Sequence, residues 1–154
     1  MEFLIVVVVI AVAAWFFLKR TRQTASPEGG TPVADLPGTG HYDFDIVGES
    51  HYQDALELIC GGRDEEGAEK YVEASLYLED TNPHDNQAVR VEIDGKTVGY
   101  LSREHARSYR RQLHASGHPR VIGVCKAVIV GGWRGDDDDW GHFGVKLDIP
   151  VKHV

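Results

Sequence analysis

Four ring-bearing side chains and one carboxylate stand near the ends of predicted strands, where they could hold a nucleotide. The rings are those of His51, Tyr52, His84 and Tyr100, and the carboxylate is that of Asp85. Flat rings stack on nucleobases with about 1 to 3 kcal/mol for each stacked base, and an ionised carboxylate accepts a hydrogen bond from a terminal sugar hydroxyl. These residue types indicate a surface that could bind a nucleotide.

Arginines at helical spacing could supply the positive charge that phosphates need. Arg103, Arg107, Arg110 and Arg111 fall on one face of a predicted helix and form a basic stripe inside an acidic domain. A solvated helix face, with its arginines paired to acids such as Glu104, has the same pattern. The sequence leaves both interpretations open, and we expect Arg103 and Arg107 to be the phosphate-binding members.

The stretch "DTNPHDNQAVRV", residues 80–91, also has the composition of an ordinary turn before a strand. The ring of Pro83 fixes its φ angle, and the side chains of Asn82 and Asp85 can bond back to the main chain. A plain turn and a ligand-binding turn are therefore both compatible with these residues.

No recognisable metal or catalytic motif occurs in the sequence. Eight histidines are present, but there is no Cys-x-x-Cys and no His-Glu-x-x-His. A P-loop is also absent, and no nucleophile has a base at a recognisable spacing. The acidic run "DDDDW" at 136–140 lacks the spaced ligands of a calcium loop and predicts a solvated hairpin tip. We expect a protein that is not an enzyme and has neither a metal nor another cofactor.

The charge balance argues against unspecific binding to nucleic acid. The chain has a formal net charge of −8. The segment before position 41 has three basic and three acidic residues, so residues 41–154 carry the whole −8. Proteins that coat nucleic acid need a broadly basic surface, so any nucleic-acid contact is expected to be local.

An uninterrupted apolar run, "FLIVVVVIAVAAWFFL", fills residues 3–18. As a helix it spans roughly 24 Å at about 1.5 Å per residue. Met1 and the long stems of Lys19 and Arg20 extend it toward the roughly 30 Å of a hydrocarbon core. Because the positive residues follow the run, we predict a single-pass anchor at 1–20, with the N-terminus outside and the domain in the cytoplasm. A cleaved signal, which would give a secreted protein, is the alternative.

After the anchor, the chain divides into a linker and one domain. Residues 21–40 are rich in Thr, Ser, Pro, Gly and Ala and have no hydrophobic period, so they cannot offset their ordering entropy and predict a flexible tether. Residues 41–154 are the only candidate domain. Cys60 and Cys125 stand in apolar neighbourhoods, which favours two buried free thiols over a disulfide.

Hydrophobic periodicity in the domain predicts short strands and two helices. The helices follow Ser50 and Ser102 as N-caps, and Asp94-Gly95 predicts a hairpin turn. The predicted strands lie at 41–48, 70–80, 88–93, 96–101, 120–133 and 141–151. This pattern favours a mainly β protein with two helices (α+β), as a small modified barrel of the OB-like or SH3-like kind.

Three segments, in this order, make the chain resemble a HIRAN domain. They are "VGESHYQ" at 47–53, "LEDTNPHDNQAVRV" at 78–91 and "GKTVGYLSREHA" at 95–106, and together they cover most of residues 44–113. HIRAN domains occur at the N-terminus of certain helicase-like chromatin remodellers and as stand-alone units in bacteria and phages.

The resemblance implies a modified OB-like barrel that holds the free 3′ end of single-stranded DNA. Asp85 matches the acid expected near the terminal sugar hydroxyl, and His84 stands where the family usually has a stacking tyrosine. Tyr100 and Arg103 fall at the strand-to-helix junction of the implied pocket and retain a ring and a positive charge.

One segment departs from the family pattern. Ser50, His51 and Tyr52 follow the first strand, where the remodeller modules have a basic residue followed by aromatics. The serine in place of a basic residue would weaken phosphate binding.

These observations predict a membrane-tethered module that binds single-stranded DNA, at its free 3′ end. The alternative is a membrane-anchored protein or peptide interaction module that uses the same barrel. The net charge of −8 and the serine at position 50 favour that alternative, and DNA, RNA and protein ligands all stay open.

Overall fold

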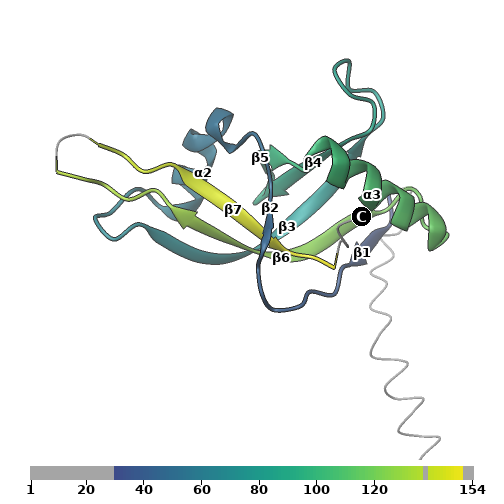
Figure 1. Ribbon diagram of the computed structural model, residues 1–154, viewed down its shortest axis with the longest axis horizontal. Coiled ribbons are helices and arrows are strands. Elements are labelled where there is room, and N and C mark those ends of the chain that lie inside the picture. The colour runs from purple at the N-terminus through teal and green to yellow at the C-terminus, as the bar shows by residue number, and fades with distance from the viewer. Residues whose placement is uncertain (1–29, 137–138, 151–154) are drawn as a thin grey trace, which may run out of the picture.

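Seven strands and two α-helices make up the part of the chain that the structure describes. The computed structural model describes residues 30–136 and 139–150 (Figure 1). The strands are β1 (Val33–Asp35), β2 (Phe44–Asp45), β3 (Ala68–Glu79), β4 (Ala88–Ile93), β5 (Lys96–Tyr100), β6 (Ile122–Gly131) and β7 (Phe143–Asp148). The helices are α2 (Gln53–Cys60), α3 (Arg103–Ala115) and a short 3₁₀ helix, η1 (Glu49–His51).

The strands form one sheet that curls on itself. Its order is β2-β7-β6-β3-β4-β5 with antiparallel neighbours, and β1 pairs in parallel with β6. After β2, Val47 and Tyr100 of β5 exchange two backbone hydrogen bonds, with N···O distances of 2.8 and 2.9 Å. This bridge brings the two ends of the strand order together. The prediction of a mainly β protein with two helices is confirmed, and the sheet is a curled half-barrel.

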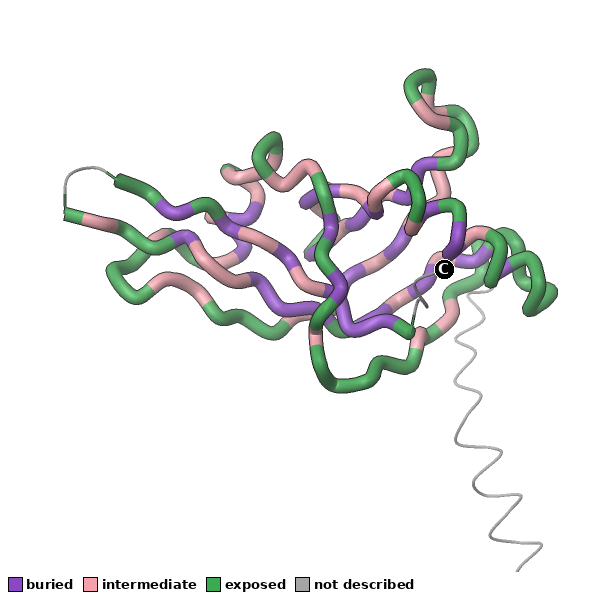
Figure 2. The backbone as a smooth tube through the Cα atoms, in the orientation of Figure 1, coloured by how far each residue is buried: buried purple, intermediate pink, exposed green. Residues whose placement is uncertain are grey.

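The hydrophobic core lies between the inner face of the sheet and the two helices. Ala74 and Leu76 of β3 are fully buried, and Leu56 of α2 and Leu113 of α3 belong to the same core cluster. Figure 2 shows that buried positions follow the strands, whereas the connecting loops are exposed. Side chains alternate between the two faces of a strand, so Tyr77, next to the fully buried Leu76, lies on the outer face of β3.

The β4–β5 hairpin turns at the predicted Asp94-Gly95 pair. Asp94 has a φ of 50° and Gly95 a φ of 70°, and two successive residues of positive φ are what a type I′ turn requires. The prediction of a hairpin at this pair is confirmed.

One predicted helix cap is confirmed and the other is wrong. The Ser102 hydroxyl oxygen accepts the His105 N–H at 3.2 Å, and α3 follows as predicted. Ser50, in contrast, lies inside η1, and α2 begins after Tyr52, whose side chain forms no cap bond. The reason is Gly48, whose φ of 85° starts a 3₁₀ turn that delays the α-helix.

The prediction of a flexible tether at 21–40 is wrong for residues 33–40, which pack against the domain. β1 and the residues after it fold onto the domain, since the Leu36 N–H donates to the Val124 carbonyl at 2.7 Å. The buried Asp148 carboxylate then accepts the N–H groups of Thr39 and Gly40 at 2.8 and 2.9 Å. These partners lie more than 80 residues along the chain, so local composition does not indicate them.

The predicted anchor at 1–20 lies outside the described residues. Within 30–136 and 139–150, no helix is both long enough and apolar enough to cross a membrane. Cys60 and Cys125 are free thiols, as predicted; Cys125 is buried, whereas Cys60 is only half-buried, so the predicted burial is confirmed for Cys125 alone. Burial is the main cause that raises the pKa of each thiol.

Candidate nucleic-acid interface

His51, Tyr52 and Tyr100 form one group of rings where η1 meets the end of β5, and we call it the ring group. The ring centres of Tyr52 and Tyr100 lie 6.4 Å apart with their planes at 44°, and those of His51 and Tyr52 lie 6.5 Å apart at 79°. Tyr52 and Tyr100 are half-buried, whereas His51 is exposed. The bridge between Val47 and Tyr100 brings the two segments together, so three of the four predicted rings are neighbours.

The Tyr100 hydroxyl is held in a fixed environment. Burial, a side-chain hydrogen bond with Tyr52 and the negative charge of Glu79 raise the pKa of Tyr100 to about 12. The phenol is therefore neutral at physiological pH. Because both rings are constrained before any ligand arrives, little ordering entropy would be lost when a base stacks on them.

From Tyr100 a row of side chains continues across the outer face of the sheet. Arg90 of β4 is the cross-strand partner of both Tyr100 and Tyr77 of β3. The guanidinium carbon of Arg90 lies 5.1 Å from the Tyr77 ring centre. Glu79 and Glu92 hold the same guanidinium at 2.6 and 2.9 Å.

The predicted site did not include Tyr77 or Arg90. The outer-face alternation of β3 was a signal for Tyr77, but its alignment with Tyr100 requires the register of three strands. Arg90 had no signal, because a single arginine in a strand is common.

Glu79 also connects this row to the turn between β3 and β4. One of its carboxylate oxygens accepts a hydrogen bond from the Arg90 guanidinium, and the other accepts one from the Asn82 side-chain N–H at 2.6 Å. The Asn82 side-chain oxygen accepts the N–H groups of His84 and Asp85 at 2.9 and 3.2 Å. This is the Asx-type turn bonding that the sequence indicates for Asn82.

The Asp85 carboxylate faces the start of α3. Its oxygens lie 3.9 Å from Nε of Arg103 and 3.7 Å from a terminal nitrogen of Arg107, and one of them accepts the Gln87 N–H at 3.0 Å. The Arg103 side chain is 78% exposed. The Arg107 side chain is 45% exposed, whereas that of Asp85 is only 15% exposed. Ion pairs of this length with exposed arginines contribute about 0 to 1 kcal/mol, so a phosphate can compete for the arginines. Three predicted site residues, Asp85, Arg103 and Arg107, are thus in one cluster.

Arg110 belongs to the predicted basic stripe, but its guanidinium is already occupied by groups of the protein. Its guanidinium donates to the carbonyls of Gln87 and Ala88 at 2.8 and 3.0 Å and to the Asp80 carboxylate at 2.7 Å. Its role is to tie the turn to α3. Arg111 is exposed.

His84 is exposed in the turn, which projects beyond the sheet next to the first turn of α3 (Figure 1). It forms no ring pair with any residue that the structure describes. The turn is therefore connected to the ring group through Asn82, Glu79 and Arg90, and not by direct stacking.

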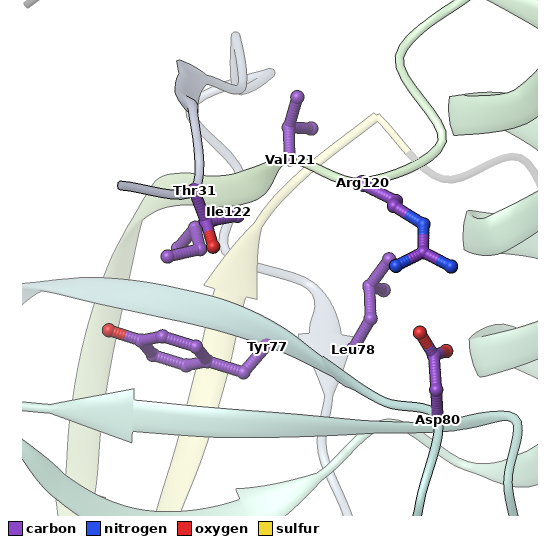
Figure 3. Close-up of a pocket in the computed structure, with 7 residues that line it drawn as sticks. All are labelled: Thr31, Tyr77, Leu78, Asp80, Arg120, Val121 and Ile122. Carbon is purple, nitrogen blue, oxygen red and sulfur yellow. The ribbon is translucent and has the colours of Figure 1, made fainter. Parts of the chain in front are cut away.

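A cavity of about 250 Å³ lies at the other end of the row, among residues outside the predicted site (Figure 3). Its lining residues are Thr31, Tyr77, Leu78, Asp80, Arg120, Val121 and Ile122. An open groove, lined by the turn and Arg90, adjoins the cavity, because both share Leu78 and Asp80. In Figure 3 the Asp80 carboxylate and the Arg120 guanidinium point toward one another.

The His, Cys, Asp and Glu side chains that the structure describes are not gathered into a metal-binding cluster. Within 30–136 and 139–150, no group of three or more His, Cys, Asp or Glu side chains is placed to hold one. Two residues of the acidic run, 137–138, lie outside the described residues.

Comparisons of the chain with models of protein families, with curated proteins and with solved structures found no match. The resemblance to HIRAN domains stays a prediction that rests on the three segments quoted above.

Proposed function

We propose that this chain is a membrane-tethered, non-catalytic module, with an OB-like barrel, that binds single-stranded DNA at its free 3′ end. Bases stack on the ring group, with His84 as a further ring at the rim. Arg103 and Arg107 contact phosphates, and Asp85 accepts the terminal sugar hydroxyl.

The observation that carries the proposal is the pairing of Tyr52 with Tyr100. Their rings are held at a 6.4 Å centre-to-centre distance on a half-exposed surface, not in the core. Aromatic rings at a partly exposed surface suit ligands that have one flat apolar face and one polar edge, and nucleobases have both. Stacking of this kind tolerates any base, so the surface would not require a particular sequence.

The cluster of Asp85, Arg103 and Arg107 supports recognition of a strand end. The last nucleotide offers a phosphate and a free hydroxyl, whereas an internal nucleotide has no free 3′ hydroxyl. Charge-assisted hydrogen bonds are the strong ones, so two arginines and a carboxylate can bind both groups together. The loose ion pairs between them let Asp85 exchange one arginine for the hydroxyl.

The chain is held in the membrane by residues 1–20, with the domain in the cytoplasm. Carbonate extraction of membranes should leave the intact chain in the pellet. A soluble and shortened chain would contradict the anchor and favour the secreted alternative.

Substitution of the two paired rings tests the binding surface. In a fluorescence-anisotropy titration with a short single strand, Tyr52→Leu and Tyr100→Leu should each lose about 1 to 3 kcal/mol of binding free energy. Tyr71→Leu is the matched control, because Tyr71 is 61% exposed and lies outside the ring group. An equal loss in all three variants would mean that the ring group is not the stacking surface.

A protein or peptide interaction module is the second candidate. Asp85 already neutralises part of the charge of Arg103 and Arg107, and the chain has a net charge of −8. A pull-down that recovers one protein partner, resists nuclease and fails after substitution of His84 and Tyr100 would support this function.

A further inference from the structure

We infer that a bound strand continues from the ring group across Arg90 and Tyr77 into the cavity beside β1, where Tyr77 stacks a further base and Arg120 binds its phosphate. This inference rests on the proposed function and extends it by one nucleotide subsite. None of the residues that line the cavity is needed for the contacts proposed at the strand end.

The row on the outer face gives the strand a continuous path. Tyr100, Arg90 and Tyr77 are direct cross-strand neighbours on β5, β4 and β3. Neighbouring strands lie about 4.8 Å apart, so the row is about 10 Å long, and β6 adds about 5 Å more. OB-type barrels bind about 4 to 16 nucleotides. A ring group of three side chains is too small for that length, so the strand needs further contacts in this direction.

The cavity has the size and the walls for one flat ring system. Its volume of about 250 Å³ is below the roughly 300 to 1,000 Å³ of sites for drug-sized ligands. Leu78, Val121 and Ile122 provide apolar surface. Figure 3 shows the Tyr77 ring and the Thr31 hydroxyl on one side of the cavity and the Arg120 guanidinium on the other. A base can stack on the ring while its polar edge faces the hydroxyl.

Arg120 is the cation available to a phosphate. It is exposed, and it forms no ion pair within 4.0 Å with any residue that the structure describes. The nearby acid, Asp80, is already compensated, because Arg110 contacts its carboxylate at 2.7 Å. The Arg120 guanidinium also points toward the Asp80 carboxylate (Figure 3), and Arg110, Arg120 and Asp80 together leave one net positive charge that a phosphate at the mouth of the cavity can meet.

The cavity depends on the segment that the sequence assigned to a tether. The Ile122 N–H donates to the Pro32 carbonyl at 2.9 Å, and this bond places Thr31 against the start of β6. Without β1 the cavity would lose the wall that Thr31 provides.

Titration of the full-length chain with single strands of two lengths tests the inference. One strand has about two nucleotides, enough for the ring group, and the other has about eight, within the range of OB-type barrels. Tyr77→Leu should weaken binding of the long strand by about 5- to 150-fold, which is the stacking range converted at tenfold per 1.4 kcal/mol. Binding of the short strand should not change.

Arg120→Gln gives an independent readout. It should make the slope of log K against log salt concentration shallower by about 0.7 for the long strand only, since one phosphate contact is lost. Because Arg120 is exposed, this variant should keep its fold. Tyr77→Phe keeps the ring and should bind the long strand as the wild type does.

Two matched control variants test whether the expected losses are specific to Tyr77 and Arg120. Tyr71→Leu removes another ring from the outer face of β3, and Arg134→Gln removes another exposed positive charge, between β6 and β7. Both should bind the long strand as the wild type does.

The outcomes separate the inference from the proposed function. If Tyr77→Leu and Arg120→Gln bind the long strand as the wild type does, while Tyr100→Leu weakens both lengths, the cavity is not a subsite and the proposed function stands. If the wild type binds neither strand, the proposed function fails and the inference fails with it.

Discussion

Tyr52 and Tyr100 lie side by side, with ring centres 6.4 Å apart. They are distant in the sequence, because Tyr52 precedes β3 whereas Tyr100 follows β4. Backbone geometry produces this contact. Gly48 starts the 3₁₀ turn that positions Tyr52, and Val47 pairs with the backbone of Tyr100. The curl of the sheet thus assembles the proposed stacking surface.

Stability should fall in alkaline solution. Burial, followed by the charges of Asp148 and Glu73, raises the pKa of Cys125 to about 12, and the pKa of Tyr100 is also raised to about 12. The unfolded chain releases these protons near the ordinary values of 9.0 and 10.0. Between about pH 9 and 12 the folded state therefore binds more protons than the unfolded state, and stability decreases as the pH rises.

Urea unfolding at about pH 8 and about pH 10.5 checks this prediction. The midpoint should be lower at the higher pH, and Cys125→Ala should reduce the difference by removing the contribution of the thiol. An unfolding midpoint that rises with pH would contradict the assigned burial of these groups.

Asp148→Asn should loosen the segment that joins β1 to the domain. The Asp148 carboxylate accepts the N–H groups of Thr39 and Gly40, and hydrogen bonds to a charged group contribute about 1.5 to 3 kcal/mol. We expect a loss of this size in the free energy of unfolding, with faster hydrogen exchange at these two amides. Asp45→Asn is the control, because Asp45 is 71% exposed in its pair with Lys146 and should cost at most about 1 kcal/mol. Equal losses in both variants would show that Asp148 does not hold the segment.

Gly132→Ala should destabilise the end of the β6–β7 hairpin. Gly132 has a φ of 70°, and a Cβ atom there would collide with the Phe143 ring. The left-handed backbone and the overpacking together should cost about 2 kcal/mol or more. Gly144→Ala is the matched control, because its added Cβ would meet no atom within 4 Å, and it should change stability by about 0.5 kcal/mol or less. Thermal unfolding of the two variants compares them directly, and similar melting temperatures would contradict the packing of Phe143 on Gly132.

Local signals in the sequence were enough for several elements of the fold. The Asp94-Gly95 turn and the Ser102 cap depend on residues within a few positions, and both are confirmed. Ser50 failed as a cap because a 3₁₀ turn comes first, and β1 was missed because its partner strand, β6, is distant in the chain. A strand of three residues is too short to show a hydrophobic period in the sequence, and its pairing with a distant strand leaves no local signal.

Some residues of the candidate site have local signals in the sequence, whereas others join the site only through contacts between distant segments. Residues next to an element boundary, such as Tyr100 and Asp85, could be selected from the sequence as candidates. Tyr77 and Arg90 join the site only through the registers of β3, β4 and β5. The structural role of Arg110 depends on carbonyl groups of the turn, which side-chain spacing along a helix cannot indicate.

Recognition of a free strand end is tested most directly by a comparison of two single strands that differ only at that end. The full-length chain is titrated with the same strand carrying either a free 3′ hydroxyl or a 3′ phosphate, by fluorescence anisotropy. We predict tighter binding to the free hydroxyl, by about 1.5 to 3 kcal/mol, because the hydrogen bond to the Asp85 carboxylate is charge-assisted. Asp85→Asn should remove most of that preference. Equal affinity for both strands, or no binding to either, would contradict the account.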